Sequence, residues 1–266
     1  MGGRGGTSHR ASGGGLPKTL ARFAELQRSA LARIGAVLSR MQQQYVQRQL
    51  QRLFAENDFG MRIDSSLIER VLASHFKTQF ETNNSGGTLD QSYRNVAAQN
   101  MFGVDTDTLR PSEHEKYGYL VSRDKVAAVS DYMAAQYGDT LIRFKREDVI
   151  DRLTYTVGDS LYDAGRNRLV AGSVKNASIT GFPGDVSNYL TRIKSAESQV
   201  GSAESWSRTV AHDYFELQYH GKLTMDHVES VTFSDAVPSN FASVVEKLKK
   251  KGISVWQVKG GRAHEL

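Results

Sequence analysis

Polar residues alternate with large apolar ones in the stretch 213–221, and the side chains best suited to chemistry lie there. Successive side chains of a β-strand point to opposite faces, so Tyr214, Glu216, Gln218 and His220 share one face if this stretch is a strand. A carboxylate, an amide and an imidazole in one row can orient a ligand and exchange protons with it. The row predicts a polar cleft, with a solvated strand face as the plainer interpretation.

A second alternating segment, 151–157, runs directly into the sequence Gly158-Asp159-Ser160. As a strand it places Arg152, Thr154 and Thr156 on one face. A guanidinium with nearby hydroxyls suits an anionic, hydroxyl-rich ligand, because guanidinium binds phosphate in a bidentate way. The alternative is an ordinary threonine-rich strand that ends in a common turn.

Composition limits the classes of protein and of site. The chain has 266 residues, of which 39% are hydrophobic, enough for one large domain or two small ones. No run approaches the roughly 18 to 20 apolar residues of a membrane helix, and the N-terminus lacks the apolar core of a signal peptide. Cysteine is absent, which excludes disulfides and thiolate nucleophiles. No two histidines have helical ligand spacing, so we expect no metal site.

The formal net charge of +5 is concentrated near the N-terminus. Residues 4–52 hold nine arginine and lysine residues against one acidic residue, Glu25, and the rest of the chain is close to balanced. We therefore expect no nucleic-acid partner. A solvated arginine-rich face is the common explanation, and an acidic partner or an anionic membrane surface would suit the same pattern.

The pattern of segments predicts an α+β fold in three parts. We expect a disordered glycine-rich arm over 1–16, a helical region over 17–137 and a β-rich domain over 138–266. An apolar stripe at helical spacing over 17–53 serves either as core or as a partner surface.

Capping boxes at Ser66-x-x-Glu69 and Thr88-x-x-Gln91 predict the starts of two helices. The expected helices cover about 17–53, 66–80, 89–101, 185–198 and 239–250, with another that ends near 136. The expected strands cover about 140–145, 152–157, 212–219, 228–233 and 253–258.

Four short motifs follow one another along the chain. They are Tyr137-Gly138-Asp139, the segment Arg152 to Ser160, the segment Ala171 to Asn176, and Glu216-x-Gln218-x-His220-Gly221. In this order they resemble the mono-ADP-ribosyltransferases found among phage head-associated proteins and among type III secreted effectors of plant pathogens. The resemblance extends from about Phe76 to Phe233.

This resemblance implies transfer of ADP-ribose from NAD to a protein side chain, often arginine, on a split and mainly antiparallel β-sandwich with flanking helices. Residue by residue it implies that Glu216 is catalytic and that NAD is held by Arg152, Thr154, Ser160 and Ser173. Tyr214, Gln218 and His220 would then contact the protein substrate. A carboxylate beside the ribose stabilises the cation that develops as nicotinamide leaves.

The sequence also departs from the family pattern. Arginine-specific members commonly carry a second Glu, or a Gln, where this chain has Tyr214. Either the acceptor is handled differently or the motif is shifted by one pair of residues. Arg143 and Arg146 are alternative counterparts of Arg152. A catalytically degenerate relative that uses the cleft to bind a host protein or peptide is therefore the alternative function.

The resemblance further implies a bacterial virulence effector that a type III system secretes into a host cell. Gly2 would permit N-myristoylation and attachment to the plasma membrane, although Gly6 stands where the motif prefers Ser or Thr. Otherwise we expect a cytoplasmic location in the host. Arg4, between glycines, would fit into the cleft as an acceptor or a plug. A phage structural protein is a third interpretation.

Overall fold

The computed structural model describes residues 15–83, 90–123, 137–161, 169–181, 215–235, 237–260 and 262–266. Its strands are β1 (Asn57–Ile63), β2 (Lys116–Ser122), β3 (Thr140–Phe144), β4 (Leu153–Val157), β5 (Gly172–Ser173), β6 (Phe215–Tyr219), β7 (Val228–Phe233), β8 (Ser254–Lys259) and β9 (Arg262–Glu265).

The α-helices of the described residues are α1 (Phe23–Gly35), α2 (Arg40–Glu56), α3 (Ile68–Leu72), α4 (Gln79–Thr82), α5 (Gln91–Phe102), α7 (Arg146–Val149) and α11 (Phe241–Lys250). Short 3-10 helices are η1 (Lys18–Leu20), η2 (Ser65–Leu67), η3 (Thr106–Thr108), η4 (Pro111–Glu113), η5 (Ile150–Arg152) and η6 (Met225–His227).

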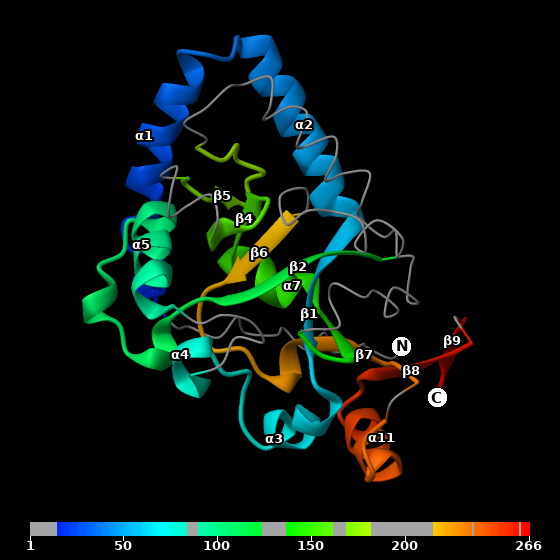
Figure 1. The fold of residues 1–266 in the computed structure, drawn as a ribbon. Helices are drawn as coiled ribbons and strands as arrows, with labels where there is room; N and C mark the ends of the chain where they lie inside the picture. Colours follow the sequence, from blue (N-terminus) through cyan, green and yellow to red (C-terminus); the bar gives the residue numbers. More distant parts are fainter. Residues whose placement is uncertain are drawn as a thin grey trace, which may run out of the picture.

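All nine strands join one twisted sheet in the order β5-β4-β6-β2-β1-β3-β7-β8-β9 (Figure 1). Every neighbouring pair is antiparallel except β7 and β8, which are parallel. The predicted α+β class is confirmed. The strands form a single hydrogen-bonded series, where the resemblance implied a sheet split into a sandwich.

Two central strands come from the part of the chain predicted to be helical. β1 follows α2 without a break, because the backbone becomes extended at Asn57 and its side chain donates to the carbonyl of Leu53, at 2.8 Å. β2 pairs with β1, and a Cβ at Gly118 would lie 2.2 Å from the carbonyl oxygen of Gly60. Neither segment was among the expected strands, and the sheet takes strands from both sides of residue 138.

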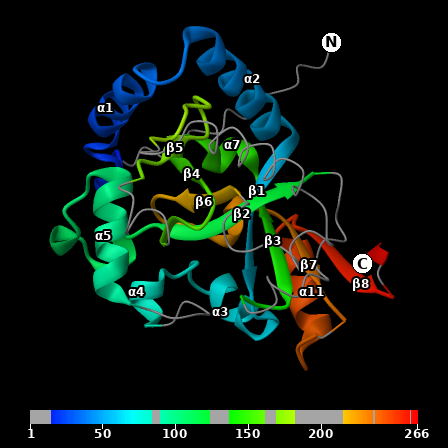
Figure 2. The ribbon, with the colours of Figure 1, turned by 45° about the horizontal axis from the view of Figure 1, so that its top comes forward.

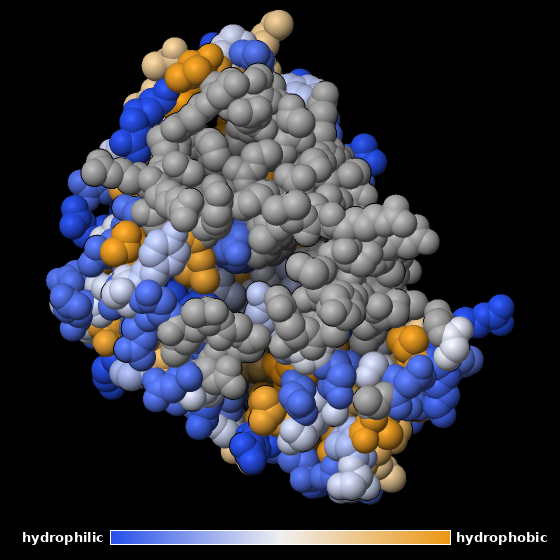
Figure 3. All heavy atoms as spheres, in the orientation of Figure 1, coloured by the Kyte–Doolittle hydropathy of each residue, from blue (hydrophilic) through white to orange (hydrophobic). Residues whose placement is uncertain are grey.

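Helices α1 and α2 form an arch at the end of the sheet that carries β4 and β5 (Figure 2). A capping box between Ser39 and Gln42 starts α2. Part of the apolar stripe predicted here is core, since Ile34 and Leu38 and, on α2, Leu50 and Leu53 are buried. Where the two helices meet, apolar side chains reach the surface, with Val37 64% and Met41 79% exposed (Figure 3).

The other segment predictions differ mainly at the helix starts. The region 66–80 contains α3 and α4 instead of one helix. Asp64, not Ser66, caps η2 before α3, and α4 begins with a capping box between Thr78 and Glu81. Asp90 caps α5, and Thr88 lies outside the described residues.

Helix α11 and the four predicted strands at 140–145, 152–157, 228–233 and 253–258 are confirmed within one or two residues. The fifth predicted strand is confirmed as β6 over Phe215–Tyr219. The helices predicted at 185–198 and before residue 136, and the glycine-rich arm up to residue 14, lie outside the described residues.

One face of the sheet packs the main hydrophobic core against α2, α3, α7 and α11. Aromatic rings dominate this face: Phe59 stacks on Phe144 with centroids 5.0 Å apart, and Phe54 meets Tyr155 edge to face at 4.8 Å. On the other face, α5 buries a smaller apolar cluster that contains Met101 and Phe102. The region between this cluster and the middle of the sheet carries the polar side chains described next.

Candidate functional site

A row of buried polar side chains lies on the face of β4 and β6 opposite the main core. The register pairs Thr154 with Gln218 and Thr156 with Glu216. All four side chains are buried, and Glu216 retains 7% exposure. The shared face predicted for these residues is therefore found, but it is buried and not a solvated strand face.

Gln218 is the centre of this row. Its Nε2 donates to Oε1 of Glu216 at 3.0 Å and to Oγ1 of Thr156 at 3.2 Å. Its Oε1 accepts from the hydroxyl of Thr154 at 2.9 Å. Thr156 in turn donates to the carbonyl of Gly158 at 3.2 Å. These bonds fix the orientation of the amide and hold one carboxylate oxygen of Glu216 in place.

His220 follows the end of β6 and extends the row. Its backbone amide donates to the carbonyl of Arg152 at 3.0 Å, and the ring of Phe102 meets the imidazole edge to face at 4.7 Å. Nε2 lies 2.9 Å from the Thr154 hydroxyl, and Nδ1 lies 2.8 Å from the hydroxyl of Thr19 on η1. Complete burial, helped by the nearby charge of Lys116, lowers the pKa of His220 to about 3, so the ring is neutral at pH 7.

Strand β2 contributes two tyrosines that sequence reasoning missed. Tyr117 pairs with Gln218 and Tyr119 pairs with Glu216 across the β2–β6 ladder. Directly opposite residues of antiparallel strands place their side chains on the same face, so both tyrosines adjoin the row. The signal in the sequence was the alternation within 116–122, which was not assigned to a strand.

Each tyrosine is tied to a charged residue. The Tyr117 hydroxyl donates to Oε1 of Glu115 at 2.6 Å, and the guanidinium of Arg94 lies 5.7 Å from the centre of its ring. Burial first, then the charges of Glu115 and Glu216, raise the pKa of Tyr117 well above its usual value. Nε of Arg62, a buried arginine, donates to the Tyr119 hydroxyl at 3.2 Å. Tyr119 is the cross-strand partner of Glu216, so Arg62 contacts a direct neighbour of the glutamate.

Arg152 lies differently from the prediction. It ends η5, and β4 begins only at the next residue, so strand alternation does not extend to it. The Arg152 side chain approaches Gly221, where a Cβ would lie 2.6 Å from its Nη1. It also bonds the hydroxyl of Tyr219, whose ring packs in the main core. The prediction that Arg152 shares a face with Thr154 and Thr156 is wrong for this reason.

The two candidate serines differ in their surroundings. Ser173 pairs with Thr154 across β5 and β4, and its hydroxyl accepts from the backbone amide of Asn176 at 3.3 Å. Ser160 follows β4 and is fully buried, and its hydroxyl has no hydrogen-bond partner among the described residues. Ser173 therefore flanks the row, and Ser160 supplies an unused polar atom near its end.

The two arginines proposed as alternatives to Arg152 lie in different parts of the fold. Glu216 pairs with Tyr119, Tyr119 with Gly60, and Gly60 with Arg143, so Arg143 is on the same face as Glu216. The two residues are three strands apart, about 14 Å at the usual strand spacing. Arg146 begins α7 and donates to the carbonyl of Phe54. Of the two, Arg143 lies on the face of Glu216.

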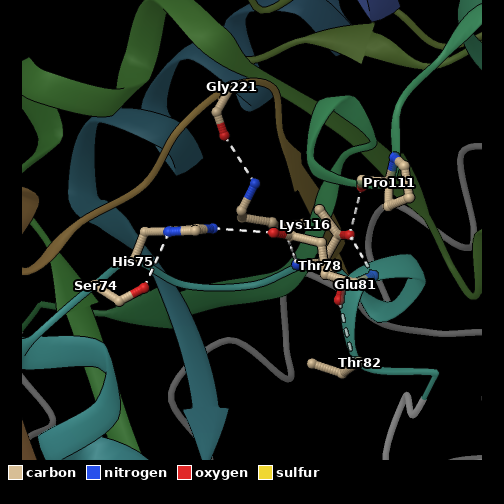
Figure 4. A network of polar contacts seen from close by, with 8 residues as sticks. All are labelled: Ser74, His75, Thr78, Glu81, Thr82, Pro111, Lys116 and Gly221. Atoms are coloured by element: carbon tan, nitrogen blue, oxygen red, sulfur yellow. Dashed lines mark hydrogen bonds and ion pairs between the residues drawn. The ribbon is translucent and has the colours of Figure 1, made fainter.

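A second polar network holds the ends of β2 and β6 together (Figure 4). Nζ of Lys116 donates to the carbonyl of Gly221 at 2.8 Å, next to His220. Glu81 accepts from the Thr78 amide and lies 3.0 Å from Nε2 of His75. Burial lowers the pKa of Lys116 to about 8, against the opposing charges of Glu81 and Glu115. The bond from Lys116 ties the start of β2 to the turn that follows His220.

The candidate site residue Tyr214 and the N-terminal residues Gly2 and Arg4 lie outside the described residues. Within the described ranges, no three His, Asp or Glu side chains are grouped as a metal site. The described helices include none with both the length and the apolar character needed to cross a bilayer.

No family model matches the chain. The chain is similar to the Gene 2 protein of Mycobacterium phage D29, with 30% identity over 126 residues. These residues make up 47% of this chain and 46% of the phage protein, so the chain spans about half the length of the curated relative it matches.

Proposed function

We propose that this protein is a mono-ADP-ribosyltransferase that transfers ADP-ribose from NAD to a protein side chain, with arginine the expected acceptor. The observation that carries the proposal is the buried carboxylate of Glu216, oriented by Gln218 in a row of hydroxyl and amide groups. The resemblance of the sequence motifs supports the same reaction.

The chemistry requires one carboxylate beside the ribose of NAD. The bond between the ribose C1′ and the nicotinamide nitrogen breaks, and its electron pair leaves with nicotinamide. The cation that develops on the ribose is stabilised by Glu216, and this stabilisation is greatest in the transition state. A nitrogen of the acceptor then bonds to C1′, and Glu216 takes the proton that this nitrogen loses.

The row supplies the other groups that the reaction needs. Gln218 holds Glu216 in one orientation. The hydroxyl of Ser173, across from Thr154, is the group of the row's edge that would contact the ribose. Arg62 and Arg94 are the basic side chains near the two tyrosines that adjoin the row, and they suit the NAD phosphates better than Arg152 does.

The biological setting belongs to the same proposal. The matched relative is a phage protein, which favours the phage-associated branch of the resemblance. Secretion by a type III system into a host cell, with a host protein as target and Gly2 as a site of acylation, rests on the resemblance alone.

A second candidate is a non-catalytic binding module that uses the same row. The position of Arg152 favours it, because the side chain that the family pattern assigns to NAD lies against Gly221 and Tyr219, and the ring of Tyr219 packs in the main core. Such a module would bind a protein or peptide without consuming NAD.

Release of nicotinamide from NAD, and transfer of labelled ADP-ribose to a small guanidine acceptor, distinguish the two candidates. In Glu216→Gln we expect both rates to fall by about two to three orders of magnitude, because a neutral amide cannot offset the developing positive charge. The matched control is Glu229→Gln, which changes an exposed glutamate on β7.

The control should keep the wild-type rates, and circular dichroism should show that both variants are folded. Equal turnover in Glu216→Gln and wild type would remove Glu216 from the reaction. A wild-type protein that neither turns over NAD nor binds it in calorimetry would favour the binding module.

A further inference from the structure

We propose that Thr19, on η1, is a positioning residue for the candidate site. It acts on Glu216 through a chain of hydrogen bonds made by three fully or nearly fully buried side chains: His220, Thr154 and Gln218. The chain links the N-terminal segment to a strand about 200 residues later in the sequence.

The direction of the chain is set at the Glu216 end. A carboxylate oxygen of Glu216 accepts from Gln218. Thr156 gives its own proton to the Gly158 carbonyl, so toward Gln218 it too can only accept. Both contacts require the NH2 group of Gln218, and its carbonyl oxygen must therefore face Thr154.

The same reasoning continues to the imidazole. The carbonyl oxygen of Gln218 takes the single hydroxyl proton of Thr154. Thr154 then has no proton left for His220, so Nε2 of His220 must be the donor to Thr154. A neutral imidazole carries one proton, and its Nδ1 is consequently an acceptor. The hydroxyl of Thr19 is the group that donates to Nδ1.

Every donor in this chain points from Thr19 toward Glu216. Hydrogen bonds aligned in one direction polarise one another, so the loss of the first donor weakens the later ones. Thr19 and His220 are both 0% exposed, which leaves no room at the surface for water to replace the Thr19 hydroxyl. The N-terminal segment thus supplies the first donor of the chain, and Glu216 is the last acceptor.

The effect on catalysis rests on the proposed transferase function, whereas the chain of hydrogen bonds does not. The first experiment therefore measures the chain directly, by NMR of the full-length protein labelled with ¹⁵N at histidine and glutamine. We expect the wild-type His220 ring to be the Nε2–H tautomer alone. An Nδ1–H tautomer, or exchange between the two, would overturn the proposal without any variant.

The second experiment compares Thr19→Val, which keeps the shape and removes the hydroxyl, with Thr19→Ser, which keeps the hydroxyl. In Thr19→Val we expect the Nδ1 signal of His220 and the side-chain amide signals of Gln218 to shift, and Thr19→Ser to restore them. Unchanged Gln218 signals in Thr19→Val would show that Thr19 does not position the site.

The activity of the same variants separates this proposal from the proposed function. We expect Thr19→Val to lower kcat for ADP-ribose transfer on the order of tenfold with little change in KM for NAD. An inactive wild type with the expected NMR shifts would refute the transferase and keep the positioning role. An active wild type with unchanged kcat in Thr19→Val would keep the transferase and refute the positioning role of Thr19.

Discussion

The two faces of β6 are equally buried but are stabilised in different ways. Phe215, Leu217 and Tyr219 pack into the main core, where dispersion and the removal of apolar surface from water dominate. On the opposite face, the amide oxygen and nitrogen of Gln218 both have hydrogen-bond partners, and one of these partners is a carboxylate oxygen of Glu216.

This difference shows what a buried polar face requires. An apolar face tolerates small rearrangements, because contact is not directional. A polar face loses the desolvation free energy of each atom whose partner is removed, so its side chains are held in one arrangement. Fixed orientation suits a site that must meet a ligand, and the comparison predicts different responses of the two faces to mutation and to pH.

The largest effect is expected on the core face. Leu217→Ala leaves a cavity at a fully buried position, and the free energy of unfolding should fall by about 2 to 5 kcal/mol. Urea denaturation would measure the change. A loss below about 1 kcal/mol would mean that this face is loosely packed and that the contrast with the polar face is smaller than we infer.

The polar face should respond to acid through His220. Its folded pKa of about 3 is lower than the usual histidine pKa of 6.5, so between these values the unfolded chain binds a proton that the folded chain does not. Stability from this group is complete above pH 6.5 and is lost as the pH falls, at about 1.4 kcal/mol per pH unit.

Urea denaturation of wild type and His220→Gln between pH 7 and pH 4.5 isolates this effect. We expect the wild type to lose about 2 to 3 kcal/mol more than the variant over that range. Parallel pH profiles would mean that the imidazole is accessible to protons in the folded protein.

The smallest effect is expected at the edge of the row. Thr156→Val removes one hydroxyl, but Gln218 keeps its bond to Glu216, so the loss should be about 1 kcal/mol. Thr154→Val breaks bonds to both Gln218 and His220 and should cost more. Thermal melts of the two variants would measure both losses of stability. Equal losses would contradict the central place of Gln218 in the row.

Periodicity predicted the two site strands because alternation needs only the local sequence. It correctly placed Glu216 and Gln218 on one face of their strand, and Thr154 and Thr156 on one face of theirs. It failed for Arg152, because a 3-10 turn interrupts the alternation one residue before β4. It also failed for β1, where the helical spacing of α2 runs into the strand without a glycine or proline to mark the change.

The polar row follows from the amino-acid sequence, because residue type and spacing on one strand fix which side chains share a face. The absence of cysteine chemistry and the basic N-terminal segment follow from the sequence as well. Only the tertiary structure brought Thr19 to His220 and Tyr117 to Gln218, since these contacts join segments separated by many residues. Burial, which follows from packing and not from pattern, then turned a row of polar residues into an oriented site.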